Sequence, residues 1–229
     1  VKGTKVKIRL GASSGEWKAM VADKAARTTF AKNIKTVLEK NKLDGIDLDF
    51  EWAENEKEYE DYSLAILKMR EMLGDKYLFS VSLHPVCYKI SKEAIEAVDF
   101  ISLQCYGPSP VRFPIEKYCS DIQMVLEYGI PKEKLVAGVP FYGVTKDNSK
   151  KTEAYFNFVQ NGLVTSPAQN EVIYQGDTYV FDGQDNIRIK TRYAKEQKLK
   201  GMMSWDLATD LPLSDSRSLL KTMTEELRE

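Results

Sequence analysis

Short apolar runs of strand length alternate along the chain with longer segments in which apolar residues recur at helical spacing. Strands are predicted at residues 5–10, 43–50, 77–83, 98–105, 135–141 and 201–205. Helices are predicted at residues 24–40, 59–73, 115–128 and 214–227. Because the strands are largely apolar and helices lie between them, the pattern predicts a parallel sheet covered by helices, the arrangement of an α/β protein.

The interval 143–199 is less regular and richer in polar residues. Within it the pattern predicts two short strands and a later helix, at residues 172–174, 178–181 and about 189–197. A turn at Gly176-Asp177 would join the two strands. We interpret the chain as one domain, 1–229, with a small insertion at about 144–186. Its six clear strands are two fewer than a closed (β/α)₈ barrel requires.

The second predicted strand carries an unusual set of acidic residues. Side chains on a strand alternate between its faces, so Asp47, Asp49 and Glu51 share one face. The opposite face is apolar and can pack against helices; it holds Ile46, Leu48 and Phe50. No Lys or Arg lies between the three carboxylates in the sequence. Asp44 has the other parity and is expected to have a structural role.

Carboxylates two residues apart on a strand lie about 6.6 Å apart. Like charges at that range, shielded from water, raise the pKa of at least one member of the set. A raised pKa is what a general acid requires at neutral pH. The pattern therefore indicates acid catalysis, and it leaves open a cation site and a solvated acidic face.

Composition excludes several other functions. The chain has 33 Lys and Arg against 34 Asp and Glu, so it lacks the basic surface of a nucleic-acid-binding protein. No stretch approaches the roughly 18 apolar residues of a membrane-spanning helix. A single histidine, His84, and three cysteines without a C-x-x-C pair argue against a metal site and against a Cys-His nucleophile. We expect no metal and no cofactor.

The acidic strand also carries a known pattern. The run Asp44-Gly45-Ile46-Asp47-Leu48-Asp49-Phe50-Glu51 resembles the D-G-x-D-x-D-x-E signature of glycoside hydrolase family 18, the chitinases and their relatives. Four further segments resemble that family's third, sixth, seventh and eighth strands, in order: 5–15, 98–106, 135–143 and 201–206. The resemblance implies a (β/α)₈ TIM barrel that is incomplete at its N-terminus, with strands three to eight recognisable. It also implies that the chain is a fragment of a longer protein, or that an upstream segment is absent.

The resemblance assigns a catalytic task to each of four residues. Glu51 would protonate the leaving glycosidic oxygen, and the acetamido oxygen of the substrate would attack the anomeric carbon in a retaining, substrate-assisted mechanism. Asp49 would orient and stabilise the acetamido nitrogen, and Asp47 would tune the protonation of Asp49. Tyr106 would hydrogen-bond the acetamido oxygen.

Four other residues are implied to bind substrate: Trp205, beneath the sugar at the cleavage site, Tyr142, Gln104 and Trp52. The expected partner is an oligosaccharide or polysaccharide containing 2-acetamido sugars. One position departs from the family, because Gly107 follows Tyr106 where Asp or Asn is usual. This departure bears on sugar preference and on the pH optimum.

Three functions remain open. The first is cleavage of β-linked N-acetylglucosamine in chitin-like glycans. The second is the same chemistry on peptidoglycan or N-glycans, as an endo-β-N-acetylglucosaminidase. The third is non-catalytic, lectin-like sugar binding, which the presence of Glu51 disfavours. The resemblance implies a secreted, periplasmic or cell-surface location.

Overall fold

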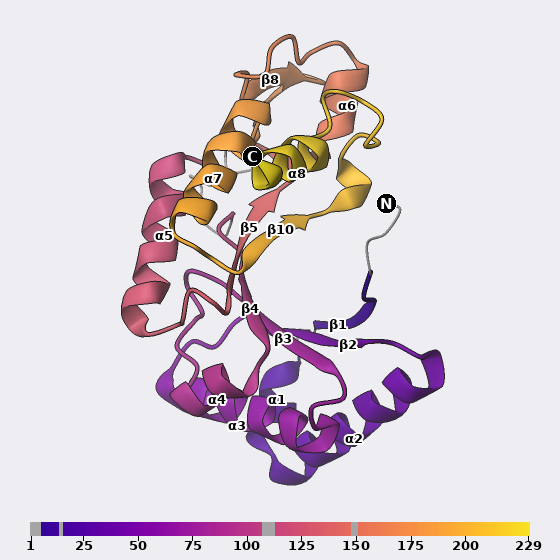
Figure 1. Cartoon of the computed structure of the whole chain (residues 1–229), viewed down its shortest axis with the longest axis vertical. Coiled ribbons are helices and arrows are strands. Elements are labelled where there is room, and N and C mark those ends of the chain that lie inside the picture. The colour runs from indigo at the N-terminus through magenta and orange to yellow at the C-terminus, as the bar shows by residue number, and fades with distance from the viewer. Residues whose placement is uncertain (1–5, 14–15, 107–112, 148–150) are drawn as a thin grey trace.

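A six-stranded parallel sheet forms the centre of the computed structural model, which describes residues 6–13, 16–106, 113–147 and 151–229 (Figure 1). Its strands follow one another in chain order: β1 (Arg9–Ser13), β2 (Gly45–Asp49), β3 (Leu78–Leu83), β4 (Phe100–Leu103), β5 (Leu135–Pro140) and β10 (Gly201–Trp205). The sheet curls into part of a barrel. The predicted incomplete (β/α)₈ barrel is thus confirmed, with β1 and β10 as the two edges of the sheet in the described chain.

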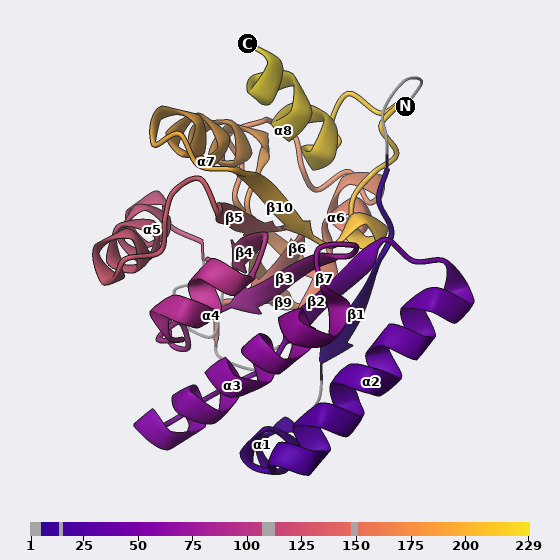
Figure 2. The same cartoon turned by 60° about the horizontal axis from the view of Figure 1, so that its bottom comes forward.

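Helices cover the outer face of this sheet, and neighbouring helices pack on one another (Figure 2). They are α1 (Trp17–Ala22), α2 (Lys24–Asn41), α3 (Glu56–Leu73), α4 (Lys92–Ala97), α5 (Ile115–Tyr128), α7 (Gln184–Glu196) and α8 (Leu219–Arg228). Side-chain caps begin several of them: Asp23 accepts from Ala26 N before α2, and Asn55 accepts from Glu58 N before α3. In the described chain no helix is long and apolar enough to cross a bilayer.

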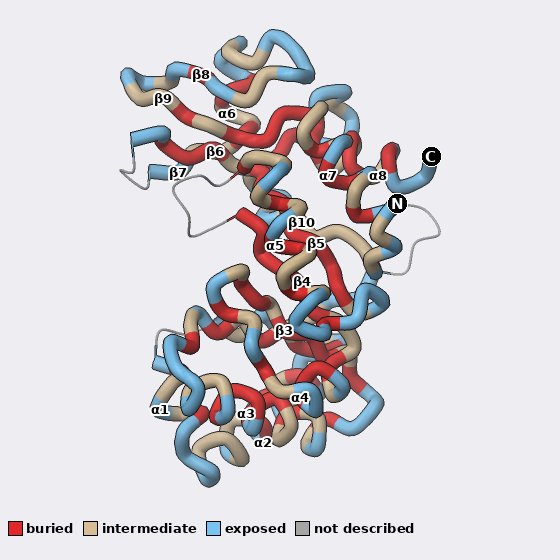
Figure 3. Tube along the Cα trace, turned by 90° about the vertical axis from the view of Figure 1, so that its left-hand side faces the viewer, coloured by how far each residue is buried: buried red, intermediate tan, exposed pale blue. Residues whose placement is uncertain are grey.

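The insertion after β5 is a small antiparallel sheet with one helix against it (Figure 3). In spatial order its strands are β7 (Thr152–Ala154), β6 (Tyr142–Thr145), β9 (Asp177–Val180) and β8 (Glu171–Tyr174). Helix α6 (Tyr155–Gln160) buries Phe158 against Tyr179 and Phe181. This burial gives the insertion apolar packing of its own.

Several predicted boundaries are wrong in detail, among them the starts of α3 at Glu56 and of α8 at Leu219, which were predicted at residues 59 and 214. The β8–β9 turn is Gln175-Gly176, because Asp177 already pairs with Tyr174 and both turn residues have positive φ, as a two-residue hairpin requires. Helix α7 begins at Gln184, before the apolar periodicity starts. Strand β1 lies at Arg9–Ser13 and not at 5–10, because its pairing with β2 continues through the small residues Gly11 and Ala12.

Gly45 at the start of β2 leaves no room for a side chain, because the neighbouring strand β3 lies against it. A Cβ at this position would lie 1.9 Å from Leu78 O, on the neighbouring strand β3. Gly45→Ala is therefore expected to force β2 and β3 apart and to destabilise the fold by about 1–3 kcal/mol. Thermal unfolding would measure this effect. Gly201→Ala on β10 is the matched control, since a Cβ there meets nothing within 4 Å; equal melting temperatures for the two variants would contradict the prediction.

Candidate active site

Strand β2 separates apolar from acidic side chains as its alternation predicts. Ile46, Leu48 and Phe50 are buried in the core between the sheet and the helices. Phe50 stacks on Trp17 of α1, with 5.2 Å between ring centroids. Asp47 and Asp49 are partly buried on the opposite face, and Glu51 just beyond the strand is exposed. Packing of the apolar face therefore orients the carboxylates toward the interior of the curled sheet.

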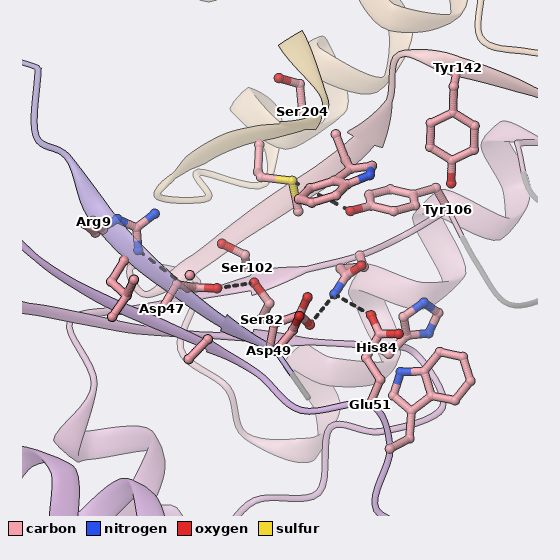
Figure 4. Close-up of a pocket in the computed structure, with 18 residues that line it drawn as sticks. Arg9, Asp47, Asp49, Glu51, Ser82, His84, Ser102, Tyr106, Tyr142 and Ser204 are labelled. Carbon is pink, nitrogen blue, oxygen red and sulfur yellow. Dashed lines mark hydrogen bonds and ion pairs between the residues drawn. The ribbon is translucent and has the colours of Figure 1, made fainter. Parts of the chain in front are cut away.

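That interior holds a cavity of about 660 Å³ (Figure 4). Its walls come from β1, β2, β3, β4, β10 and the start of β6, at the carboxyl ends of the parallel strands, where such barrels place their sites. All eight residues singled out from the sequence line it: Asp47, Asp49, Glu51, Trp52, Gln104, Tyr106, Tyr142 and Trp205. Gly107 and the loop residues Ser14-Gly15 lie outside the described residues.

Asp47 lies deepest of the three carboxylates and receives several hydrogen bonds. Ser82 Oγ donates to Asp47 Oδ2 over 2.7 Å, and Ser80 Oγ donates to Oδ1. Arg9 reaches in from β1, and its Nη1 lies 3.4 Å from Asp47 Oδ1. The deep end of the site therefore contains a charge-paired carboxylate with both oxygens engaged.

Asp49 and Glu51 form a second group, joined by one side chain. Gln104 Nε2 lies 2.8 Å from Asp49 Oδ1 and 3.3 Å from Glu51 Oε1, and donates to both. Burial, together with the negative charges of Glu51 and Asp47, raises the pKa of Asp49 to about 7, although the hydrogen bond from Gln104 opposes this shift. At neutral pH the site can therefore hold or release a proton at Asp49, next to Glu51.

Aromatic rings form the walls above the carboxylates. Tyr106 is almost fully buried and packs edge-on against Tyr142, with 6.3 Å between centroids. Burial raises the pKa of Tyr106, so its hydroxyl stays protonated and can donate a hydrogen bond into the cavity. Trp205 at the end of β10 is 56% exposed although it is a large apolar side chain. An exposed indole at a polar cavity is the platform that sugar rings use.

The sequence analysis did not single out three residues that bond to Asp47, namely Arg9, Ser80 and Ser82. The sequence contains two spacing patterns that bear on these residues. Ser80 and Ser82 share a face of β3, and Arg9 follows Lys7 at strand spacing. Neither pattern indicates which strands are neighbours in the sheet. The pairing of β1 with β2 places Arg9 beside Asp47. Asp44 has the structural role expected of it, since its Oδ2 accepts from Ile8 N over 2.7 Å.

The arrangement also bears on the cation-site alternative. Among the described residues, no three His, Cys, Asp or Glu side chains are arranged to hold a metal ion. The oxygens of Asp47 interact with Arg9 and accept hydrogen bonds from two serines. Asp49 and Glu51 both accept hydrogen bonds from Gln104. A curled parallel sheet with paired acids and aromatic walls at its carboxyl end is the class of site found in barrel enzymes that act on sugars.

Comparison with known proteins identifies the family. The family model for glycosyl hydrolases family 18 matches residues 2–210, and the chain belongs to this family. It is 24% identical over 273 aligned positions to "Probable chitinase 2" of Drosophila melanogaster, covering 90% of this chain and 56% of that protein. The chain therefore spans little more than half the length of that relative.

Two solved structures are similar in fold. The GH18 chitinase ChiB of Flavobacterium johnsoniae is 26% identical with a TM-score of 0.81, covering 96% of this chain and 74% of the other. A chitinase of Bacteroides thetaiotaomicron is 21% identical with a TM-score of 0.85, covering 96% and 76%. The second likeness shows the fold alone.

Proposed function

We propose that the protein is a retaining glycoside hydrolase that cleaves β-linked N-acetylglucosamine in chitin-like glycans, with Glu51 as general acid. The observation that carries the proposal is the coupling of Glu51 through Gln104 to Asp49, a carboxyl whose pKa is about 7. A general acid needs a pKa near the working pH, and carboxylates that share a site titrate as a coupled set. The family membership and the chitinase relatives support the choice of substrate.

The proposed reaction needs no protein nucleophile. Glu51 transfers its proton to the glycosidic oxygen as the bond to the anomeric carbon breaks. The acetamido oxygen of the same sugar attacks that carbon, forming an oxazolinium ion and releasing the leaving sugar as an alcohol. Ionised Asp49 accepts a hydrogen bond from the acetamido N–H, which stabilises the positive charge that develops there. Water then attacks the anomeric carbon as its bond to the acetamido oxygen breaks, which restores the acetamido group, and the water gives its proton to Glu51, which restores the acid.

The aromatic residues supply the binding part of the proposal. Trp205 would lie beneath the sugar ring at the cleavage site, and the Tyr106 hydroxyl would donate to the acetamido oxygen and hold it toward the anomeric carbon. Tyr142 and Trp52 would contact neighbouring sugars. All four rings line the same cavity as the carboxylates, which supports these roles. The loops around the cavity are expected to decide between chitin, peptidoglycan and N-glycans. Family membership supports a location outside the cytoplasm.

Substrate assistance has its own test. A thiazoline analogue of the oxazolinium ion is expected to inhibit hydrolysis of a fluorogenic N-acetylglucosamine oligomer, binding about 10²-fold or more tighter than an uncleaved oligomer of equal length. Proton NMR of the first product should show the β-anomer. Hydrolysis that the thiazoline leaves untouched would refute substrate assistance. Binding of chito-oligomers without turnover would refute the enzyme and leave the lectin-like alternative.

A further inference from the structure

Arg9 is the one Lys or Arg side chain among the described residues that line the cavity with the carboxylates. It belongs to β1, which pairs in parallel with β2 so that Arg9 is in register with Gly45 and Gly11 is in register with Asp47. Gly45 lies on the same face as Asp47 and places no side chain between that carboxylate and Arg9. The guanidinium carbon lies 4.6 Å from the centroid of the Phe100 ring on β4, which fixes its position from the other side.

Arg9 acts on Asp47 in two ways. Its Nη1 is 3.4 Å from Asp47 Oδ1, and the same nitrogen donates to Ser80 Oγ. A serine hydroxyl has a single hydrogen, so a serine that accepts from Arg9 turns that hydrogen toward Asp47. With Ser82 bonded to the other oxygen, Asp47 faces one positive charge and two hydroxyl donors. Both oxygens of Asp47 are thus engaged by groups from the two neighbouring strands β1 and β3.

The three carboxylates are therefore divided into two groups. Asp47 is bonded to Arg9, Ser80 and Ser82, whereas Asp49 and Glu51 share the amide of Gln104. Figure 4 shows Arg9 and Ser82 beside Asp47, with Asp49 and Glu51 further along the cavity. We propose that Arg9 is a positioning residue that holds Asp47 in place, so that the proton used in catalysis moves only between Asp49, Glu51 and the substrate. This inference rests on the proposed function, and its physical content can be tested without turnover.

The charged and titratable groups around Asp47 come from several elements. Strand β1 contributes Arg9, and β2 contributes Asp49 with Glu51 beyond its end. Strands β3 and β4 face it with neutral side chains, and their titratable residues, His84 and Tyr106, lie beyond the strand ends. Removing the charge of Arg9 leaves only negative charges close to Asp47. Proton uptake by the set should then begin at higher pH, because each carboxylate raises the cost of ionising the others.

The test is a carboxyl ¹³C NMR titration of the wild type and of Arg9→Lys, Arg9→Gln and Arg9→Met. In the wild type, the carboxyl signal of Asp47 is expected to stay constant over the pH range in which the signal of Asp49 shifts. In Arg9→Gln and Arg9→Met, proton uptake by the set should move up by about 1 pH unit, with Asp47 now taking part. Arg9→Lys keeps the charge and should stay close to the wild type. The acidic limb of the kcat/KM profile should shift in the same order.

Arg70 provides a matched control. It also bonds an aspartate, Asp99, over 2.9 Å, and stacks on a phenylalanine, Phe79, but it lies outside the cavity. Arg70→Gln should leave the titration of the site unchanged. A wild-type Asp47 that takes up a proton together with Asp49 would overturn the proposal, as would unchanged titration in Arg9→Gln or an equal shift in Arg70→Gln. A wild type without turnover would refute the proposed function only, because the NMR titration still decides the role of Arg9.

Discussion

Glu51→Gln is expected to lower kcat for an N-acetylglucosamine oligomer by about 10²- to 10⁴-fold while leaving oligomer binding nearly intact. Glutamine has the size and shape of glutamate and can accept the Gln104 hydrogen bond that Glu51 accepts. It has no proton to give to the leaving oxygen. Steady-state kinetics with a fluorogenic oligomer would measure the loss, and isothermal titration calorimetry would show that binding persists.

Glu54→Gln is the matched control for this variant. Glu54 lies three residues further along, is 76% exposed as a side chain and pairs with Lys18 away from the cavity. It should keep the wild-type rate. Both variants should keep the wild-type melting temperature, since exposed positions of this kind contribute about 0.5 kcal/mol or less to stability. Equal rates for Glu51→Gln and the wild type would show that another group supplies the proton.

The largest stability effect is expected outside the site, at the ion pair of Lys190 and Asp182. Both side chains are about 1% exposed. Lys190 Nζ donates to Asp182 Oδ2 over 2.5 Å and to Phe113 O over 2.8 Å. Lys190→Met would leave Asp182 buried without its counter-charge and should cost about 3–5 kcal/mol of unfolding free energy. Urea unfolding at neutral pH would measure this cost.

The pH dependence of that loss has a definite sign. Burial raises the pKa of Asp182 in the folded protein. Without Lys190 the folded state should bind a proton at Asp182 more tightly than the unfolded chain does. Stability of Lys190→Met should therefore fall as the pH rises above the unfolded-state pKa of an aspartate, and recover in part on acidification. The loss is expected to be largest at neutral pH.

Two further variants control for this interpretation. Lys190→Met combined with Asp182→Asn removes the unpaired charge and should be less destabilised than Lys190→Met alone. The pair Lys146–Glu171 is exposed on both sides, so Lys146→Met should cost less than about 1 kcal/mol. If Lys190→Met lost no more stability than Lys146→Met, the buried pair would not be an important contribution to the fold.

Local pattern was enough to predict the main elements of the barrel. Helix α5 lies at the predicted residues, and β2, β3, β4, β5 and β10 fall within the predicted runs. The short helices α1, α4 and α6 and the strands β6 and β7 were missed. Elements of three to six residues hold too few apolar positions to show a period, and packing against larger neighbours stabilises them.

The sequence by itself determined the family and the acidic face of β2, because strand alternation is a local property that requires Asp47, Asp49 and Glu51 to point the same way. Only the tertiary structure decided how these carboxylates are divided. Arg9, Ser80 and Ser82 come from neighbouring strands, and Gln104 comes from beyond the end of β4. The order of strands in the sheet and their registers bring these side chains together. Those registers depend on packing between segments far apart in the chain, which no local pattern records.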